Sequence, residues 1–114
     1  MRRSVQELTL PVFTLEVDKT ETGLRDVEEV VRFLRDRVEA HPLARFVGIY
    51  DHHAHTRSLE EGYVDPAIRG ASALVFCFGL TLPEPACMAV RPRTMAVCEL
   101  DDRFVITFAE PPMP

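Results

Sequence analysis

The sequence lacks several features that would point directly to a function. It contains no tryptophan and only five glycines, which form neither a G-x-G-x-x-G pattern nor a phosphate-binding P-loop. Cysteine is scarce as well. The three cysteines, Cys77, Cys87 and Cys98, are odd in number and show no C-x-x-C spacing, which favours reduced thiols over a disulfide framework. We therefore expect neither a nucleotide-binding loop nor a secreted disulfide scaffold.

Long apolar runs and clustered positive charge are also missing. No uninterrupted apolar stretch approaches the roughly 20 residues needed to cross a bilayer, and the N-terminus has no apolar signal-peptide core. The formal net charge is −5, and no basic run is longer than Arg2-Arg3. Because nucleic-acid binding needs a concentrated positive surface, we expect a cytoplasmic protein that binds neither membranes nor nucleic acid.

The composition that remains is typical of one globular domain. The chain has 114 residues, of which 46% are hydrophobic and 27% are charged, enough for one core but not for two of ordinary size. We expect a single domain over residues 1–114. Residues 1–8 and 110–114 are expected to be extended termini, the second because Pro111-Pro112-Met113-Pro114 favours polyproline-like chain.

Hydrophobic periodicity predicts one helix and five strands. Apolar residues at three- and four-residue steps predict a helix from Leu24 to about Ala40, capped by Thr20 or Thr22. Alternating or continuous apolar residues predict strands over residues 10–18, 46–55, 73–78, 94–100 and 103–109. We expect an α+β fold, a two-layer sandwich with a five-stranded mixed sheet and one long helix on one face (β-α-β-β-β-β).

Two turns are expected to join these elements. Asp101-Asp102 predicts the tight turn of a closing hairpin. Residues 57–70 are expected to form a long loop with one helical turn that begins after Asp65 at Pro66.

The strand predicted over residues 46–55 ends in a group of acid and imidazole side chains. Alternate side chains of a strand share one face, roughly 6.6 Å apart, so Asp51, His53 and His55 would form a row. Carboxylate and imidazole groups bind zinc and other divalent transition metals. These three residues are therefore the candidate metal ligands, with zinc as a candidate cofactor. A structural explanation also fits, in which a His-Asp pair forms hydrogen bonds at a subunit interface.

Other residues suggest weaker sites. Arg91 and Arg93 are candidates for binding a carboxylate or phosphate, because guanidinium groups bind these anions through paired hydrogen bonds; arginines paired with nearby acids are the alternative. Cys87 lies beside Met88 in a proline-rich connection and is expected to be exposed, where this soft pair is of the type that binds Cu(I). Cys77 and Cys98 are expected to be core residues.

An apolar strand that ends in Asp-His-His resembles the signature of the DHH phosphoesterases, which hydrolyse phosphodiesters or pyrophosphate with paired metals. Paired metals need carboxylates from further motifs. No Asp-x-Asp precedes the strand, and only 50 residues stand before Asp51. We therefore reject this assignment.

A second resemblance covers residues 46–112. Its shared points are Asp51-His52 after the second strand, Phe78-Gly79 followed by Pro83, and a closing hairpin that runs into Pro111. In these points the sequence resembles a family of small bacterial β-α-β-β-β-β proteins classed as a domain of unknown function. The resemblance implies a compact domain that associates as a dimer, and it implies no established activity. It also implies that Asp51 and His52 are the pair to consider for ligand binding.

Three functional hypotheses result. The first is a small binding protein that holds a metal ion or small anion at the cluster Asp51–His55. The second is a structural or regulatory homodimer in which these residues only form hydrogen bonds, and in which a second copy covers apolar sheet residues that one helix leaves open. The third is a metal-dependent hydrolase with Glu60, Glu61 or Asp51 as general base. The sequence favours the first two over the third.

Overall fold

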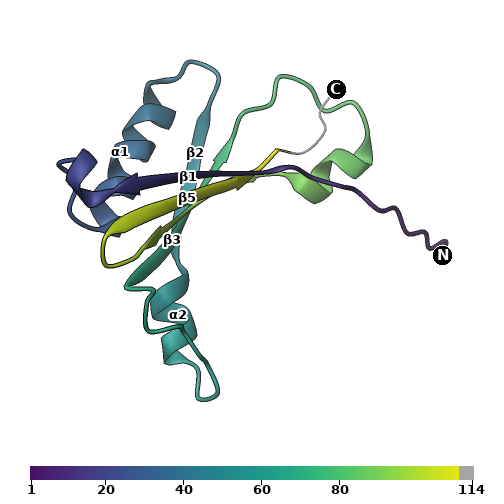
Figure 1. The fold of residues 1–114 in the computed structure, drawn as a ribbon. Coiled ribbons are helices and arrows are strands. Elements are labelled where there is room, and N and C mark those ends of the chain that lie inside the picture. Colours follow the sequence, from purple (N-terminus) through teal and green to yellow (C-terminus); the bar gives the residue numbers. More distant parts are fainter. Residues whose placement is uncertain (111–114) are drawn as a thin grey trace.

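A five-stranded sheet with strand order β1-β5-β4-β3-β2 is the centre of the fold in a computed structural model that describes residues 1–110 (Figure 1). Part of the C-terminal tail predicted to be extended, residues 111–114, lies outside the described residues. The elements in chain order are β1 (Val12–Asp18), the 3-10 helix η1 (Lys19–Glu21), α1 (Val27–Ala40), β2 (Arg45–Asp51), α2 (His52–Ser58), β3 (Gly70–Cys77), the 3-10 helix η2 (Pro85–Val90), β4 (Arg93–Glu99) and β5 (Arg103–Ala109).

The α+β class is as predicted, but the predicted mixed sheet is wrong. All four pairs of neighbouring strands are antiparallel. β1 and β2, which α1 connects, lie at opposite edges of the sheet, because β5 pairs with β1 and joins it to β4. We predicted a parallel pair because a helix lies between β1 and β2 in the sequence. In the structure these two strands are not neighbours.

Helix α1 matches the predicted apolar periodicity, but it begins three residues later than expected. Asp26, and not Thr20 or Thr22, is the N-cap, because its Oδ1 accepts a hydrogen bond of 2.9 Å from the backbone N–H of Glu29. The helix ends at Ala40. The next residue precedes Pro42 and has extended backbone angles, as proline requires of its predecessor.

The core lies between α1 and the face of the sheet that α1 covers. Val30 and Val31 of α1 pack there with Val97 of β4 and Phe104 of β5. Phe104, Val97 and Leu74 have at most 1% of their surface exposed. α1 packs chiefly on β2, β3 and β4, so the core sits away from β1.

Glu99, at the end of β4, fixes the first turn of α1 against the sheet. Its Oε1 accepts a hydrogen bond of 3.0 Å from the backbone N–H of Val27, and its Oε2 accepts one of 2.8 Å from Nζ of Lys19. A carboxylate beside the first N–H groups of a helix also interacts favourably with the helix dipole. One side chain therefore ties β4, η1 and α1 together beside Phe104.

Residues 1–11 contain no helix or strand, and residues 1–9 are exposed. Figure 1 shows this N-terminal segment running away from the sheet beyond β1. None of the helices in residues 1–110 has the length and apolar character needed to cross a lipid bilayer.

Removing the ring of Phe104 is expected to lower the free energy of unfolding by about 3–5 kcal/mol, because Phe104→Ala leaves a cavity in a core that is closed to solvent. Urea unfolding followed by circular dichroism measures the change. Phe78→Ala is the matched control, since Phe78 follows β3 with 43% of its surface exposed. Equal losses in the two variants would contradict this assignment of the core.

Candidate functional site

The strand predicted to run through residues 46–55 ends at Asp51, and the chain turns directly into α2. Asp51 causes this turn. Its Oδ1 accepts a hydrogen bond of 2.8 Å from the backbone N–H of Ala54, which makes Asp51 the N-cap of the helix. The extended Asp-x-His-x-His row is therefore wrong, because successive residues of a helix point in directions about 100° apart.

The three histidines of α2 lie in two different surroundings. The rings of His52 and His55 lie edge-on to the Tyr50 ring, with centroids 4.6 and 5.6 Å from it, and Nδ1 of His55 is hydrogen-bonded to the Tyr50 hydroxyl. His53 contacts a different segment, since its Nε2 lies 3.1 Å from the backbone oxygen of Ile68. Within residues 1–110, no three His, Cys, Asp or Glu side chains are arranged to hold a metal ion.

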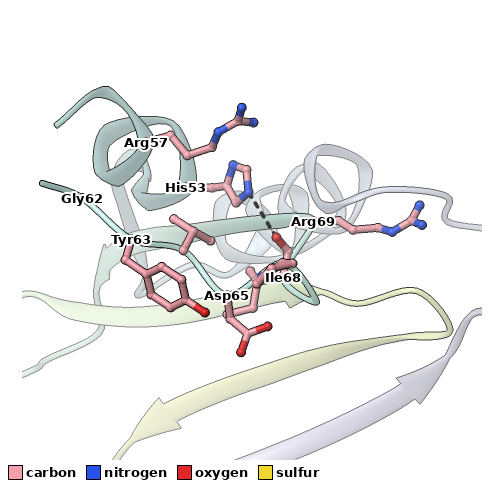
Figure 2. A pocket seen from close by; sticks show the side chains of 9 residues that line it. His53, Arg57, Gly62, Tyr63, Asp65, Ile68 and Arg69 are labelled. Atoms are coloured by element: carbon pink, nitrogen blue, oxygen red, sulfur yellow. Dashed lines mark hydrogen bonds between the residues drawn. The ribbon is translucent and has the colours of Figure 1, made fainter. Parts of the chain in front are cut away.

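His53 instead lines an open hollow between α2 and residues 62–69. The hollow has a volume of about 650 Å³, and its lining residues are His53, Arg57, Gly62, Tyr63, Val64, Asp65, Pro66, Ile68 and Arg69. His53 and Arg57 are four residues apart and so share one face of α2. Figure 2 shows them extending from the helix above Tyr63 and Asp65, while the Arg69 side chain points to one side.

Two local features shape the hollow. Gly62 lies so close to α2 that a Cβ atom there would be 2.0 Å from the backbone oxygen of Thr56, so only glycine allows this approach. Asp65 forms a turn at the predicted position, but residues 66–67 form a simple turn and not the predicted helical one. Its Oδ1 accepts a hydrogen bond of 2.8 Å from Ala67 N–H, and its carbonyl accepts one of 2.9 Å from Ile68 N–H. This turn presents the Ile68 carbonyl to His53.

The contacts of the lining residues define which polar groups are available. A carbonyl oxygen only accepts hydrogen bonds, so Nε2 of His53 carries a proton and Nδ1 of the neutral ring has a lone pair. Arg69 forms an ion pair with Asp101 outside the hollow. Arg57 forms no hydrogen bond or ion pair with any residue in 1–110. Arg57 is therefore the available cation of this lining.

The other arginines singled out in the sequence do not line the hollow. Nη1 of Arg91 donates a hydrogen bond of 2.6 Å to the Thr81 carbonyl, and the Arg91 guanidinium lies beside Gly79. Nη1 of Arg93 lies 3.4 Å from the Glu110 carboxylate. The Arg93 contact is the pairing with an acid that was given as the alternative, whereas the Arg91 contact is with a backbone carbonyl.

The cysteines do not contribute to the hollow either. Cys87 is buried, with 7% of its surface exposed, so the expectation that it is exposed was wrong. Cys77 and Cys98 are partly buried. Burial raises the pKa of the Cys98 thiol because the charged thiolate loses hydration. At the start of β5, hydrogen bonds to the Glu16 and Asp102 carboxylates raise the pKa of Arg103.

Comparison with known families adds one result. Residues 1–114 match the family described as "Family of unknown function (DUF6858)". The chain belongs to this family. The predicted resemblance to a domain of unknown function is thereby confirmed, over the whole chain and not only from residue 46. No curated protein and no solved structure gives a significant match. Family membership assigns no activity, so the site must be judged from its geometry.

Sequence reasoning missed Arg57, Tyr63 and Arg69 as neighbours of His53. The four-residue spacing of His53 and Arg57 was the available signal, but it has meaning only on a helix. Asp51 followed by Ala54 is equally compatible with an N-cap. Interpreting Asp51 as an N-cap would have placed His53 and Arg57 on one face of the helix that follows.

We expect Asp51→Ala to lower the free energy of unfolding by about 0.5–2 kcal/mol, since the variant leaves the Ala54 N–H without its acceptor. Asp51→Asn is the matched control and should retain most of the stability, because an amide oxygen also caps helices. Urea unfolding without added metal measures both changes. An Asp51→Ala variant as stable as the wild type would contradict the capping role.

Proposed function

We propose that the protein is a small-molecule binding module, and that its ligand carries an anionic group such as a carboxylate or phosphate. The ligand occupies the hollow between α2 and residues 62–69. The observation that carries this proposal is the position of Arg57, which lines the hollow beside His53 and has no partner in the part of the chain described. A guanidinium without a partner in a concave site is a ready binding group for such an anion.

His53 supports the same ligand chemistry. Its Nε2–H donates to the Ile68 carbonyl at 3.1 Å, so Nδ1 is the ring nitrogen left for a ligand. When Nδ1 carries a proton, it can donate a hydrogen bond to an anion while Nε2–H stays bonded to Ile68. The Tyr63 hydroxyl adds a further donor to the lining.

The charges of the lining residues indicate how many negative charges the ligand carries. Arg57 contributes one positive charge, Asp65 contributes one negative charge, and Arg69 is already paired with Asp101. This balance suits a ligand with one or two negative charges better than a polyanion such as nucleic acid.

An anion suits the arrangement better than the metal ion considered from the sequence. Asp51 serves as a helix cap, His55 is bonded to Tyr50, and His53 points to another segment. A zinc site needs three or four such ligands around one point. Glu60 and Glu61 do not line the hollow, so we do not extend the proposal to hydrolysis.

The three cysteines support a cytoplasmic location for the protein. All three are free thiols, a state that reducing compartments maintain. This part of the proposal is independent of the ligand.

A titration with inorganic phosphate and, separately, with acetate tests the binding proposal. In ¹H–¹⁵N NMR spectra at constant ionic strength, saturable shifts are expected for His53, Arg57, Tyr63 and Ile68. Arg57→Gln is expected to weaken binding by about tenfold or more, because charged hydrogen bonds contribute about 1.5–3 kcal/mol.

Arg32→Gln is the matched control, because it removes the same charge from the exposed face of α1 and does not line the hollow. It should bind as the wild type does. Two results would contradict the proposal: shifts that fail to saturate with either anion, or equal affinity in the Arg57→Gln and wild-type proteins.

A further inference from the structure

A second unexplained surface lies beside β1, away from the hollow. α1 packs chiefly on β2, β3 and β4, and next to it an apolar groove of about 370 Å³ stays open over β1 and β5. Its apolar lining includes Leu15, Val17, Phe33, Phe104 and Ile106. On the same face, the Phe13 and Phe108 rings stack with centroids 5.2 Å apart. The apolar surface thus continues along the two strands beyond the groove.

Several apolar side chains of β1 are exposed. Val12, Phe13 and Leu15 have 67%, 49% and 58% of their surfaces exposed. β1 pairs with β5 on one side and is the last strand of the sheet on the other. Exposed apolar side chains and an unpaired strand edge therefore occur in the same seven residues.

The two edges of the sheet differ in how they are protected. β2, at the far edge, carries an irregularity between Phe46 and Gly48 that interrupts its register. Such bulges twist an edge strand and hinder pairing with another chain. β1 has an unbroken register from Val12 to Asp18. Of the two edges, β1 is therefore the one prepared to accept another strand.

The hydrogen bonds at both ends of β1 show which backbone groups face this edge. The Pro11 carbonyl accepts a hydrogen bond from Glu110 N–H, and Lys19 N–H donates one to the Asp102 carbonyl. In an antiparallel pair, hydrogen-bonded residues alternate with residues that point away. Odd-numbered residues of β1 therefore bond to β5. The N–H and C=O groups at the open edge belong to Val12, Thr14, Glu16 and Asp18.

We propose that a second copy of this chain pairs antiparallel with β1 about a two-fold axis at Leu15. The sheet then runs through ten strands, and the two apolar grooves meet across the axis. Each even-numbered residue finds an even-numbered partner: Thr14 faces Glu16 of the second copy, and Val12 faces Asp18 of the second copy. All four edge residues of β1 are paired in this single register.

The apolar side chains of β1 favour a second copy as the occupant, and its charges allow one. In this register no two carboxylates are directly opposite, since Glu16 opposes a threonine and Asp18 opposes a valine, and the two Glu16 side chains are diagonal neighbours across the axis. Glu16 is also bonded to Arg103 at 3.1 Å in its own chain. On the groove side, Leu15 faces Leu15 of the second copy, and Phe13 faces Val17 of the second copy. The surface is complementary to itself, as a two-fold interface requires.

Sedimentation velocity of the intact protein, over a wide range of concentration, tests the proposal. Wild-type protein should sediment as a dimer that dissociates on dilution. Thr14→Pro removes one open-edge N–H without removing a bond to β5, which an edge strand tolerates. It should raise the dimer dissociation constant by at least about tenfold. Thr14→Ala keeps the N–H and should remain a dimer.

Leu15→Lys is a second variant, which places two ammonium groups opposite each other across the axis and should also yield monomers. Circular dichroism melting of each variant shows that a monomer is folded. Three results would overturn the proposal: a wild-type protein that stays monomeric at millimolar concentration, a Leu15→Lys variant that dimerises as the wild type does, or Thr14→Ala dissociating as readily as Thr14→Pro.

Discussion

The width of one helix is the constraint on which this structure depends. A helix with its side chains is about 10 Å across, and neighbouring strands lie about 4.8 Å apart, so one helix covers two or three strands. α1 is held over β2, β3 and β4 by its packing on these strands and by Glu99, which fixes its first turn. It also covers Phe104 at the start of β5, but the apolar face over β1 and the rest of β5 is left open. The exposed β1 is thus a consequence of the limited number of strands that α1 covers.

The second constraint is the abrupt end of β2. Asp51 stops the strand and starts α2 in one residue, and this places α2 beyond the end of β2, as Figure 1 shows. A helix in that position has no sheet beneath most of its surface. The segment 62–69 supplies the opposing wall through Gly62 and the turn at Asp65. The proposed binding site and the proposed dimer surface therefore lie on parts of the chain that α1 does not cover.

The sequence predicted those features that local patterns determine. The periodicity of α1, the hairpin turn at Asp101-Asp102 and the turn at Asp65 each depend on residues close together in the chain. The sheet order was not predictable, because pairing β1 with β5 depends on contacts between distant residues. The same limit applied to His53, whose partner Ile68 is fifteen residues away. Asp51 was misassigned because a polar residue after an apolar strand fits either a longer strand or a helix cap.

Amide hydrogen exchange at β1 is the most direct test of the claim that a second copy covers what α1 leaves open. The account predicts that at high protein concentration the Thr14 and Glu16 amides exchange as slowly as amides of the interior strand β4, and that dilution accelerates them. The Leu15 amide, which bonds to β5 in each chain, should change much less. Rapid exchange of Thr14 and Glu16 at every concentration, at the rate of the exposed residues 1–9, would contradict it.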